Sequence, residues 1–383
     1  MITSACILVL VVLLISSPLL WRNCRNARRS LKSYCIPFQP ISAQLCTVDL
    51  LVRRCLSIPH DTWMLKSSVC KLPSRAYNAV FLLAAVGHCL TKGRSEAYRP
   101  TLEREIDTML TKLCAHSFAC CQRAELCLLG YALLSFYRVW GKSHYIEKAS
   151  EIFALLNEWK EGNHEKVVPY GPSYQNKMMV DTLGMTIPFM VLYATISKSA
   201  QAMELSCRCM NLYMQHGINQ RFGLPYHAVD LDSKLPEGSM LWSRGIGWYL
   251  LALGSLIQAQ APGFEKYSKS AHHVYETLRR YAPKLLFSGF VSETSPLDTS
   301  GTSMILLGLH WAGIDLGDLE GHIKELLRRI KHDGTVLSSL GDCPSLNTYA
   351  LSYGYTPYGQ AYTCMLVSEY LSSQHSDLLS GAQ

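Results

Sequence analysis

The sequence is poor in charged residues, and its first forty positions hold no acidic residue at all. Charged residues make up 17% of the 383 residues and apolar residues 49%. This balance excludes a disordered chain and is sufficient for a large buried core. The formal net charge is +7, and residues 1–40 hold five basic residues, so the remainder carries 7 − 5 = +2. A nearly neutral remainder offers no basic surface for nucleic acid, which we exclude as a partner.

Several motifs that would assign other functions are also missing. No two of the fifteen cysteines are spaced as Cys-x-x-Cys, and no spacing is typical of a zinc site, so we predict no metal. The cysteines are scattered, many of them within apolar helical patterns. This distribution favours small buried thiols in a reduced setting, and it leaves room for a few disulfides. The chain has no Asn-x-Ser/Thr acceptor, so nothing supports exposure in a secretory lumen.

Residues 2–21 form an uncharged, mostly apolar run that is long enough to cross a bilayer. The basic cluster follows this run instead of preceding it, which favours a signal anchor over a cleaved signal peptide. The positive-inside tendency would keep the cluster and the following domain in the cytosol, which conflicts with an enzyme of the secretory path. We therefore expect a membrane-anchored or secreted protein and leave the side of the membrane open. The chain divides into residues 1–40, the anchor and a basic linker, and residues 41–383, one domain.

Helical periodicity dominates this domain, and strand-like alternation is nearly absent. About twelve helices are expected, and they alternate between apolar helices rich in small residues and helices with one charged face. The apolar set comprises residues 74–90, 119–140, 177–197, 239–260, 300–313 and 357–373. This alternation predicts an all-α (α/α)6 barrel, in which six hairpins close into a ring with the apolar helices inside. A plain helical-repeat scaffold is the competing architecture, but the sequence has no fixed period.

Aromatic, glycine and proline residues gather in the loops that precede the expected inner helices. These loops include residues 170–174, 222–227, 293–298 and 353–357. All of them would lie at one end of the ring. Such residues fit a carbohydrate-binding mouth.

The stretch LWSRGIGWYLLA at residues 241–252 combines two tryptophans with an arginine at the start of an apolar helix. The indole faces of Trp242 and Trp248 can stack on sugar rings, and the Arg244 guanidinium can bind a carboxylate with two hydrogen bonds. Together they predict a helix entrance that faces a pocket for a ring carrying a carboxylate. The alternative is a glycine-containing turn before a core helix, with tryptophans that pack and an arginine on the surface.

Asp181 lies near the start of an expected inner helix, in VDTLGMTIPFM. It could cap the first turn, where an acid meets the positive end of the helix dipole. It could equally serve as a proton donor in an apolar pocket, because burial disfavours the charged form of a carboxyl group. Pro188, later in the helix, fits a kink or packing role.

The order of these motifs resembles the unsaturated glucuronyl and rhamnogalacturonyl hydrolases, glycoside hydrolase families 88 and 105, and is closer to family 105. The resemblance rests on Asp181 in VDTLGM, His227 in RFGLPYH, WSRGIGW at residues 242–248 and SGTSM at residues 300–304. It covers about residues 74–371, and WSRGIGW and VDTLGM are its specific parts. The family's fold is an (α/α)6 barrel, which agrees with the helix pattern.

The resemblance implies removal of a Δ4,5-unsaturated uronic acid from the non-reducing end of oligosaccharides that a polysaccharide lyase has produced. An aspartate, matched by Asp181, protonates C4 of the enol ether and then acts as base for the water that adds at C5. The resulting hemiketal opens and releases the next sugar. His227 matches a histidine at the sugar-binding face, Arg244 the arginine near the uronate carboxylate, and Trp242 and Trp248 the ring-stacking walls. His227 alone would more often be a loop or capping histidine.

Two departures from the family pattern bear on substrate and activity. The family's second aspartate is matched by Glu125, which keeps the charge but is one methylene longer, and which alternatively is a solvated or capping acid. Ile246 replaces a polar residue in the family's RGNGW. We expect an unsaturated uronyl hydrolase that needs no cofactor or metal, because proton transfer and water addition need only a carboxylate and orientation. The alternatives are a non-catalytic barrel that binds carbohydrate or protein, and another (α/α)6 enzyme such as a sugar epimerase.

Overall fold

The computed structural model describes residues 49–56, 75–93, 99–113, 123–282, 285–292, 296–343 and 345–380. The predicted membrane segment at residues 2–21 and the linker to residue 40 lie outside the described residues. Within the described part, one helix, α7 (Val180–Ser197), is apolar and long enough to cross a membrane by length and composition. It is 61% buried inside the protein, as a core helix is.

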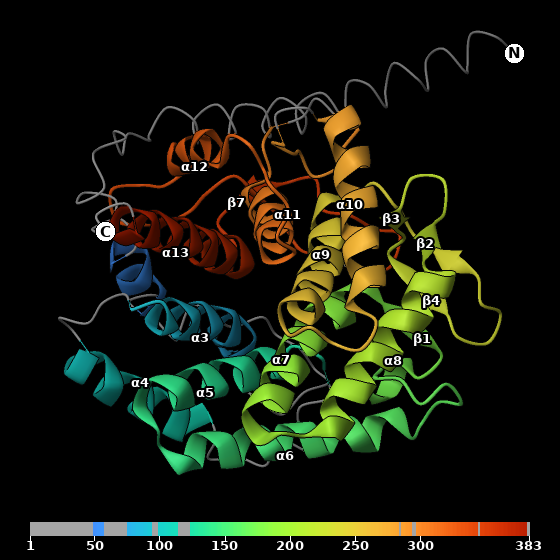
Figure 1. Cartoon of the computed structure of the whole chain (residues 1–383), viewed down its shortest axis with the longest axis horizontal. Coiled ribbons are helices and arrows are strands. Elements are labelled where there is room, and N and C mark those ends of the chain that lie inside the picture. The colour runs from blue at the N-terminus through green and yellow to red at the C-terminus, as the bar shows by residue number, and fades with distance from the viewer. Residues whose placement is uncertain are drawn as a thin grey trace, which may run out of the picture.

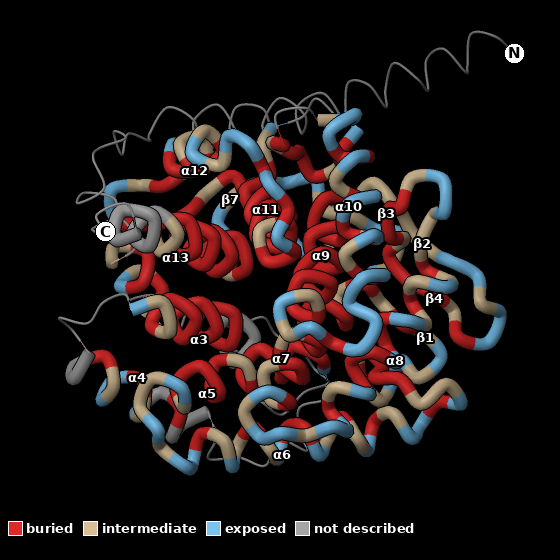
Figure 2. Tube along the Cα trace, viewed as in Figure 1, coloured by how far each residue is buried: buried red, intermediate tan, exposed pale blue. Residues whose placement is uncertain are grey.

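Six helices form a closed inner ring (Figure 1). They are α3 (Arg75–Thr91), α5 (Leu126–Trp140), α7, α9 (Ser243–Gln258), α11 (Thr299–Trp311) and α13 (Pro357–Ser380). Each packs on the next in chain order, and α13 returns to pack on α3. Figure 2 shows that these helices are mostly buried around their circumference. A helix that is apolar around its whole circumference must be covered on all sides, as these helices are. The predicted ring of apolar inner helices is therefore confirmed.

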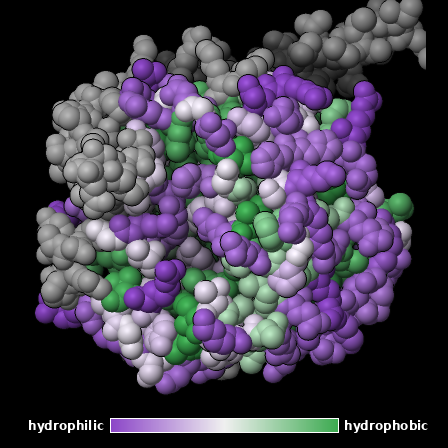
Figure 3. All heavy atoms as spheres, in the orientation of Figure 1, coloured by the Kyte–Doolittle hydropathy of each residue, from purple (hydrophilic) through white to green (hydrophobic). Residues whose placement is uncertain are grey.

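A second set of helices covers the ring. It comprises α4 (Arg99–Leu113), α6 (Ser143–Lys160), α8 (Ala200–His216), α10 (Phe264–Tyr281) and α12 (Leu319–Leu327), and residues 49–56 are also helical. In α10 the buried side chains recur three or four positions apart, at Tyr267, Ala271, Val274 and Leu278. One face is therefore buried, while charged residues occupy the other face. Hydrophilic residues accordingly dominate the surface in Figure 3.

The sequence predicted almost no strands, but short strands form at the N-terminal end of the inner helices. Three short antiparallel sheets form there: β1 (Lys177–Met179) with β4 (Ala228–Asp230) and β5 (Pro236–Glu237), β2 (Ile218–Asn219) with β3 (Leu224–Pro225), and β6 (Ser339–Leu340) with β7 (Tyr353–Gly354). Each strand has two or three residues, which is too short to show alternation in the sequence. The predicted helix at residues 177–197 accordingly begins at Val180, after strand β1.

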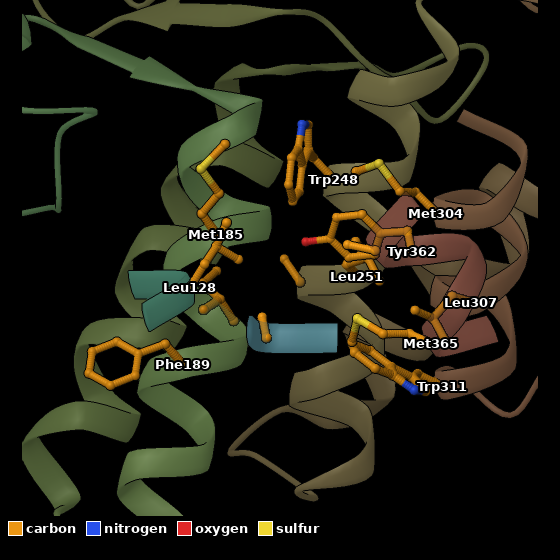
Figure 4. Close-up of a cluster of buried hydrophobic side chains, with 14 of the residues drawn as sticks. Leu128, Met185, Phe189, Trp248, Leu251, Met304, Leu307, Trp311, Tyr362 and Met365 are labelled. Carbon is orange, nitrogen blue, oxygen red and sulfur yellow. The ribbon is translucent and has the colours of Figure 1, made fainter. Parts of the chain in front are cut away.

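Large side chains fill the axis of the ring, and small residues let the inner helices approach one another. Figure 4 shows a column of side chains that runs from Trp248 at one end, past Tyr362 and Met365, to Trp311 at the other. A Cβ added to Gly308 would lie 2.6 Å from the backbone of Leu250, so α9 and α11 are in direct contact. The inner ring is thus a packed core, and a ligand site has to lie at one of its ends.

The cysteines that the structure describes are free thiols. Six of these seven are buried, and Cys343 is half-buried. The Sγ atoms of Cys89 on α3 and Cys364 on α13 lie 3.5 Å apart, where the ring closes. For this part of the chain the predicted buried thiols are confirmed.

Candidate active site

Asp181 and His227 are brought together by backbone pairing at the start of α7. Strand β1 pairs with β4 so that Met179 lies opposite Ala228, and the N–H of Val180 donates to the carbonyl of His227 at 2.9 Å. This pairing places Nε2 of His227 3.4 Å from Oδ2 of Asp181. Helix α7 starts without a side-chain cap, and Oδ2 is buried with no hydrogen-bond partner. The capping alternative for Asp181 therefore has no support in this geometry.

His227 is buried and packs against Trp242 and Tyr349, whose rings also contact each other. Its ring centroid lies 4.5 Å from that of Trp242 and 5.6 Å from that of Tyr349, and Nδ1 lies 3.1 Å from the Tyr349 hydroxyl. Gly238 has φ +83, and a Cβ at this position would lie 2.4 Å from Cβ of His227. The β5–α9 connection thus needs glycine to lie close to the histidine. These contacts leave the ring one orientation, with Nε2 toward Asp181.

Arg244 is buried, which corrects the alternative of a surface charge. Its Nη1 donates to the carbonyl of Leu340 and its Nη2 to that of Gly341, both at 3.0 Å. The guanidinium carbon lies 4.9 Å from the ring of Trp242 and 4.4 Å from that of Tyr358. Nη2 also donates to Sγ of Cys343 at 3.7 Å, so three of the five N–H donors of the guanidinium are used and two are left for a ligand. The predicted contact with a uronate carboxylate stays a prediction.

The two tryptophans of the motif lie in different surroundings. Trp242 packs between His227 and Arg244, whereas Trp248 packs against Gly184 of α7 and edge-on against Tyr362, at 5.4 Å. Both rings are buried, and both indole N–H groups are buried without a hydrogen-bond partner. In Figure 4 the Trp248 nitrogen points away from the axial column. Their role as ring-stacking walls stays a prediction.

Glu125 precedes the first turn of α5 and is buried, which rules out the alternative of a solvated acid. Its side chain makes no cap hydrogen bond. The hydroxyl of Tyr170 donates to Oε1 at 2.5 Å, while Oε2 is buried and unpaired. Burial raises the pKa of Glu125, and the nearby negative charge of Asp181 acts in the same direction. The two acids therefore share one end of the ring, as the sequence predicts.

Residues 72–333 match the sequence model of Glycosyl Hydrolase Family 88, which is more than half of the chain. The chain belongs to glycosyl hydrolase family 88. Known structures share the fold of this family 88 chain at low identity. A possible member of family 105 from Salmonella enterica is 14% identical, with a TM-score of 0.67, over 89% of this chain and 96% of that one. An unsaturated glucuronyl hydrolase specific for heparin is 15% identical, with a TM-score of 0.65, over 91% and 98%.

The same fold carries other activities as well. An α-1,6-mannanase variant from Salegentibacter sp. is 15% identical to this family 88 chain, with a TM-score of 0.60, over 86% of this chain and 98% of that one. The fold alone therefore does not assign a substrate. The substrate of this family 88 chain has to be inferred from its own site residues.

Two residues that the sequence did not single out organise the site of this family 88 chain. Tyr349 contacts His227, Trp242 and Phe290, and its hydroxyl accepts from the N–H of Ser239 at 2.9 Å. Its only sequence signal is the run of tyrosines that precedes α13.

Asp298 caps α11 and ties three chain segments together. Its Oδ1 accepts from the Ser300 N–H at 3.0 Å and from the Leu340 N–H at 3.0 Å, and its Oδ2 accepts from the Ser243 hydroxyl at 3.3 Å. A Cβ at Gly301 would lie 2.2 Å from Oγ of Ser243. The SGTSM motif of family 88 thus positions the residue next to Arg244, which is a structural role.

Unpaired buried polar atoms gather at this end of the ring. They are Oδ2 of Asp181, Oε2 of Glu125, Oγ1 of Thr182 and the indole nitrogens of Trp242 and Trp248. Buried polar groups are normally hydrogen-bonded, so this set indicates a place for a polar ligand. Across the described residues, no group of three His, Cys, Asp or Glu side chains is placed to hold a metal ion.

Proposed function

We propose that this chain removes a Δ4,5-unsaturated uronic acid from the non-reducing end of lyase-generated oligosaccharides. The observation that carries the proposal is the Asp181 carboxyl, whose Oδ2 faces Nε2 of His227 at 3.4 Å while the side chain keeps 18% of its surface exposed. Among the described residues this carboxyl caps no helix and pairs with no lysine or arginine, which leaves it available for proton transfer. His227 packs against Trp242, whose ring contacts the buried guanidinium of Arg244, a group that can bind the carboxylate of an anionic sugar.

In the proposed reaction Asp181 donates its proton to C4 of the enol ether, and C5 gains positive character. Water adds its oxygen to C5 and returns a proton to the Asp181 carboxylate, so the acid is regenerated. C5 now carries a hydroxyl and the ring oxygen, which is a hemiketal. It opens to a C5 ketone and leaves C1 as a hemiacetal, which releases the next sugar. One carboxyl group therefore supplies both proton transfers, unlike the pair of carboxylates in ordinary glycosidases.

The surrounding residues would bind and orient the sugar. Arg244 is held rigidly by the carbonyls of Leu340 and Gly341, so its remaining donors are preorganised for the uronate carboxylate. Burial raises the pKa of Glu125, so this acid tends to keep its proton and can donate to a sugar hydroxyl through Oε2. Trp242 packs between His227 and Arg244 and would hold both side chains in place.

The test is a screen of full-length protein in detergent against unsaturated disaccharides that lyases release from rhamnogalacturonan, glycosaminoglycans and algal polysaccharides. We expect one class to lose the ultraviolet absorbance of its enol ether and to yield the released sugar. Asp181→Asn should lower kcat/KM by ~10²–10⁴-fold because it removes the proton. Asp232→Asn is the matched control, since the Asp232 side chain is 70% exposed.

A non-catalytic carbohydrate- or protein-binding barrel is the second candidate. Ile246 is buried where the family has a polar residue, and three Arg244 donors are used by the protein itself. If no disaccharide is consumed but one binds equally to the wild-type protein and to Asp181→Asn, the binding function replaces the hydrolase. Isomerised product without release of a sugar would indicate an epimerase instead.

We further propose that residues 2–21 attach the protein to a membrane, on the basis of their sequence alone. Full-length protein should remain with the membrane fraction after alkaline extraction. A variant that lacks residues 2–21 should be released. Release of both proteins would contradict attachment.

A further inference from the structure

Three polar groups follow one another from Asp181 to the loop between β6 and β7. His227 lies in the middle, with Nε2 3.4 Å from Oδ2 of Asp181 and Nδ1 3.1 Å from the Tyr349 hydroxyl. The N–H of Ser239 donates to the same hydroxyl oxygen at 2.9 Å. The Asp181 contact is slightly long for a hydrogen bond, as such contacts often are without substrate.

The hydrogen-bond capacities of these groups favour one of the two imidazole tautomers. A tyrosine hydroxyl has one donor and two acceptor positions, and Ser239 occupies one acceptor position. Among the described residues, Nδ1 of His227 is the acceptor within reach of the Tyr349 proton. Burial raises the pKa of Tyr349, so the phenol keeps this proton. A neutral imidazole that accepts at Nδ1 carries its own proton on Nε2, facing Asp181.

We propose that Tyr349 is a positioning residue that fixes His227 in the Nε2–H tautomer, so that this N–H binds Oδ2 of Asp181 and reserves Oδ1 for the reacting carbon and water. This inference rests on the function proposed above. The Nε2–H group stabilises the carboxylate that forms when C4 takes the proton. With the other tautomer, Nε2 would accept the Asp181 proton and hold it away from the substrate.

The structure also explains how a loop residue can act with this accuracy. The base of the loop is fixed because Arg244 donates to the carbonyls of Leu340 and Gly341, and the Tyr358 hydroxyl donates to the carbonyl of Leu340 at 2.9 Å. The ring of Tyr349 packs edge-on against Phe290, with centroids 5.0 Å apart. The hydroxyl is therefore held by packing as well as by hydrogen bonds.

Other titratable groups face Asp181 from the neighbouring elements. They are Glu125 from α5, Tyr213 from α8 and Cys343 from the loop, and each interacts electrostatically with Asp181. Burial raises the pKa of all three, and raises that of Cys343 to about 12. All three are unchanged when only Tyr349 is substituted, so a difference between the wild-type protein and the variant reports the tyrosine alone.

The test is Tyr349→Phe, which keeps the ring contacts and removes the hydroxyl. We expect kcat to fall by about 10–100-fold with nearly unchanged KM, as for other residues that orient a catalytic group. The pH–rate profile should also change, because the hydrogen-bond chain from Tyr349 through His227 to Asp181 is broken. Tyr281→Phe is the control: this tyrosine is 42% exposed at the end of the outer helix α10. Equal thermal midpoints would show that both variants fold.

A second measurement separates this inference from the proposed function. The ¹⁵N chemical shifts of the His227 ring, assigned by comparison with His227→Gln, report which nitrogen is protonated without any substrate. We expect the Nε2–H pattern in the wild-type protein and a mixture in Tyr349→Phe. An inactive wild-type protein with this pattern would end the proposed function but leave the tautomer assignment intact. Unchanged shifts together with an unchanged pH profile in Tyr349→Phe would overturn the role of Tyr349.

Discussion

His88 on α3 and Glu369 on α13 form a buried ion pair, with Nε2 of the histidine 3.0 Å from Oε1 of the glutamate. Trp311 donates to the same oxygen at 3.1 Å, and Lys92 lies 2.9 Å from Oε2. Trp311 marks the end of the axial column opposite Trp248 (Figure 4). The two ends of the ring therefore differ: at one end both oxygens of the Glu369 carboxyl are paired, while at the other end Oε2 of Glu125 is buried without a hydrogen-bond partner.

Glu369→Gln should destabilise the protein by ~3 kcal/mol at neutral pH, because it removes one partner of a buried pair. Burial alone would raise the pKa of Glu369, but His88 and Lys92 outweigh it and hold the pKa well below its usual range. A lowered pKa means that the contribution is present above the unfolded value of about 4.3 and is lost as pH falls below it. Urea unfolding at several pH values measures this, and the difference should shrink in acid.

The matched control is Glu151→Gln, which breaks the exposed pair with Lys148 on α6. A surface pair contributes ~0–1 kcal/mol, so this change should alter the free energy of unfolding very little. Equal losses from both substitutions would contradict the role assigned to Glu369.

Glu125→Gln tests the buried acid at the other end. Because burial raises the pKa of Glu125, the folded state prefers the protonated form, and wild-type stability declines as pH rises above the unfolded value of about 4.3. Glutamine cannot ionise and can still accept from Tyr170. In thermal melts from pH 4 to pH 8, the midpoint of Glu125→Gln should therefore rise relative to that of the wild-type protein as pH rises. A constant difference would show that Glu125 ionises as freely in the folded protein as in the unfolded chain.

Gly184→Ala tests the contact between α7 and α9. An added Cβ would lie 2.3 Å from the Trp248 ring and 2.8 Å from its Cα, so either the ring or the helix must move. We expect a loss of ~1–3 kcal/mol in the free energy of unfolding. Gly354→Ala is the control, because no atom lies within 4 Å of a Cβ at that position. If the two variants have the same urea midpoint, the close packing of Trp248 on α7 is not as described.

The helices were predictable because their signals are local. The pattern places one apolar helix at residues 357–373, and α13 begins at residue 357. The prediction for α9 began four residues early, at residue 239, because the chain there forms a bridge between Trp242 and Phe290. Such a bridge depends on a partner far along the sequence, which periodicity does not detect.

The site was predictable only in part, for a similar reason. Asp181 and His227 are joined by the pairing of β1 with β4, and their motifs indicated both residues. Tyr349 reaches His227 from a distant loop, and no local pattern distinguishes it from the neighbouring tyrosines. Arg244 was expected to hold a ligand, but its first partners are carbonyls of the chain itself. A residue type fixes which bonds a side chain can make, and the tertiary structure selects among them.

Because α13 packs on α3, the inner ring can close only after α13 has been synthesised. The 24-residue α13 is the last helix described, and until it is synthesised the apolar flanks of α3 and α11 have no neighbour. During translation the ring would therefore stay open and expose apolar surface on α3 and α11. Chaperones that act on nascent chains bind such exposed apolar surface. A stop codon before α13 would leave Asp181, His227 and Arg244 encoded, but it would remove the Tyr358 contact of Arg244 and yield an aggregating polypeptide.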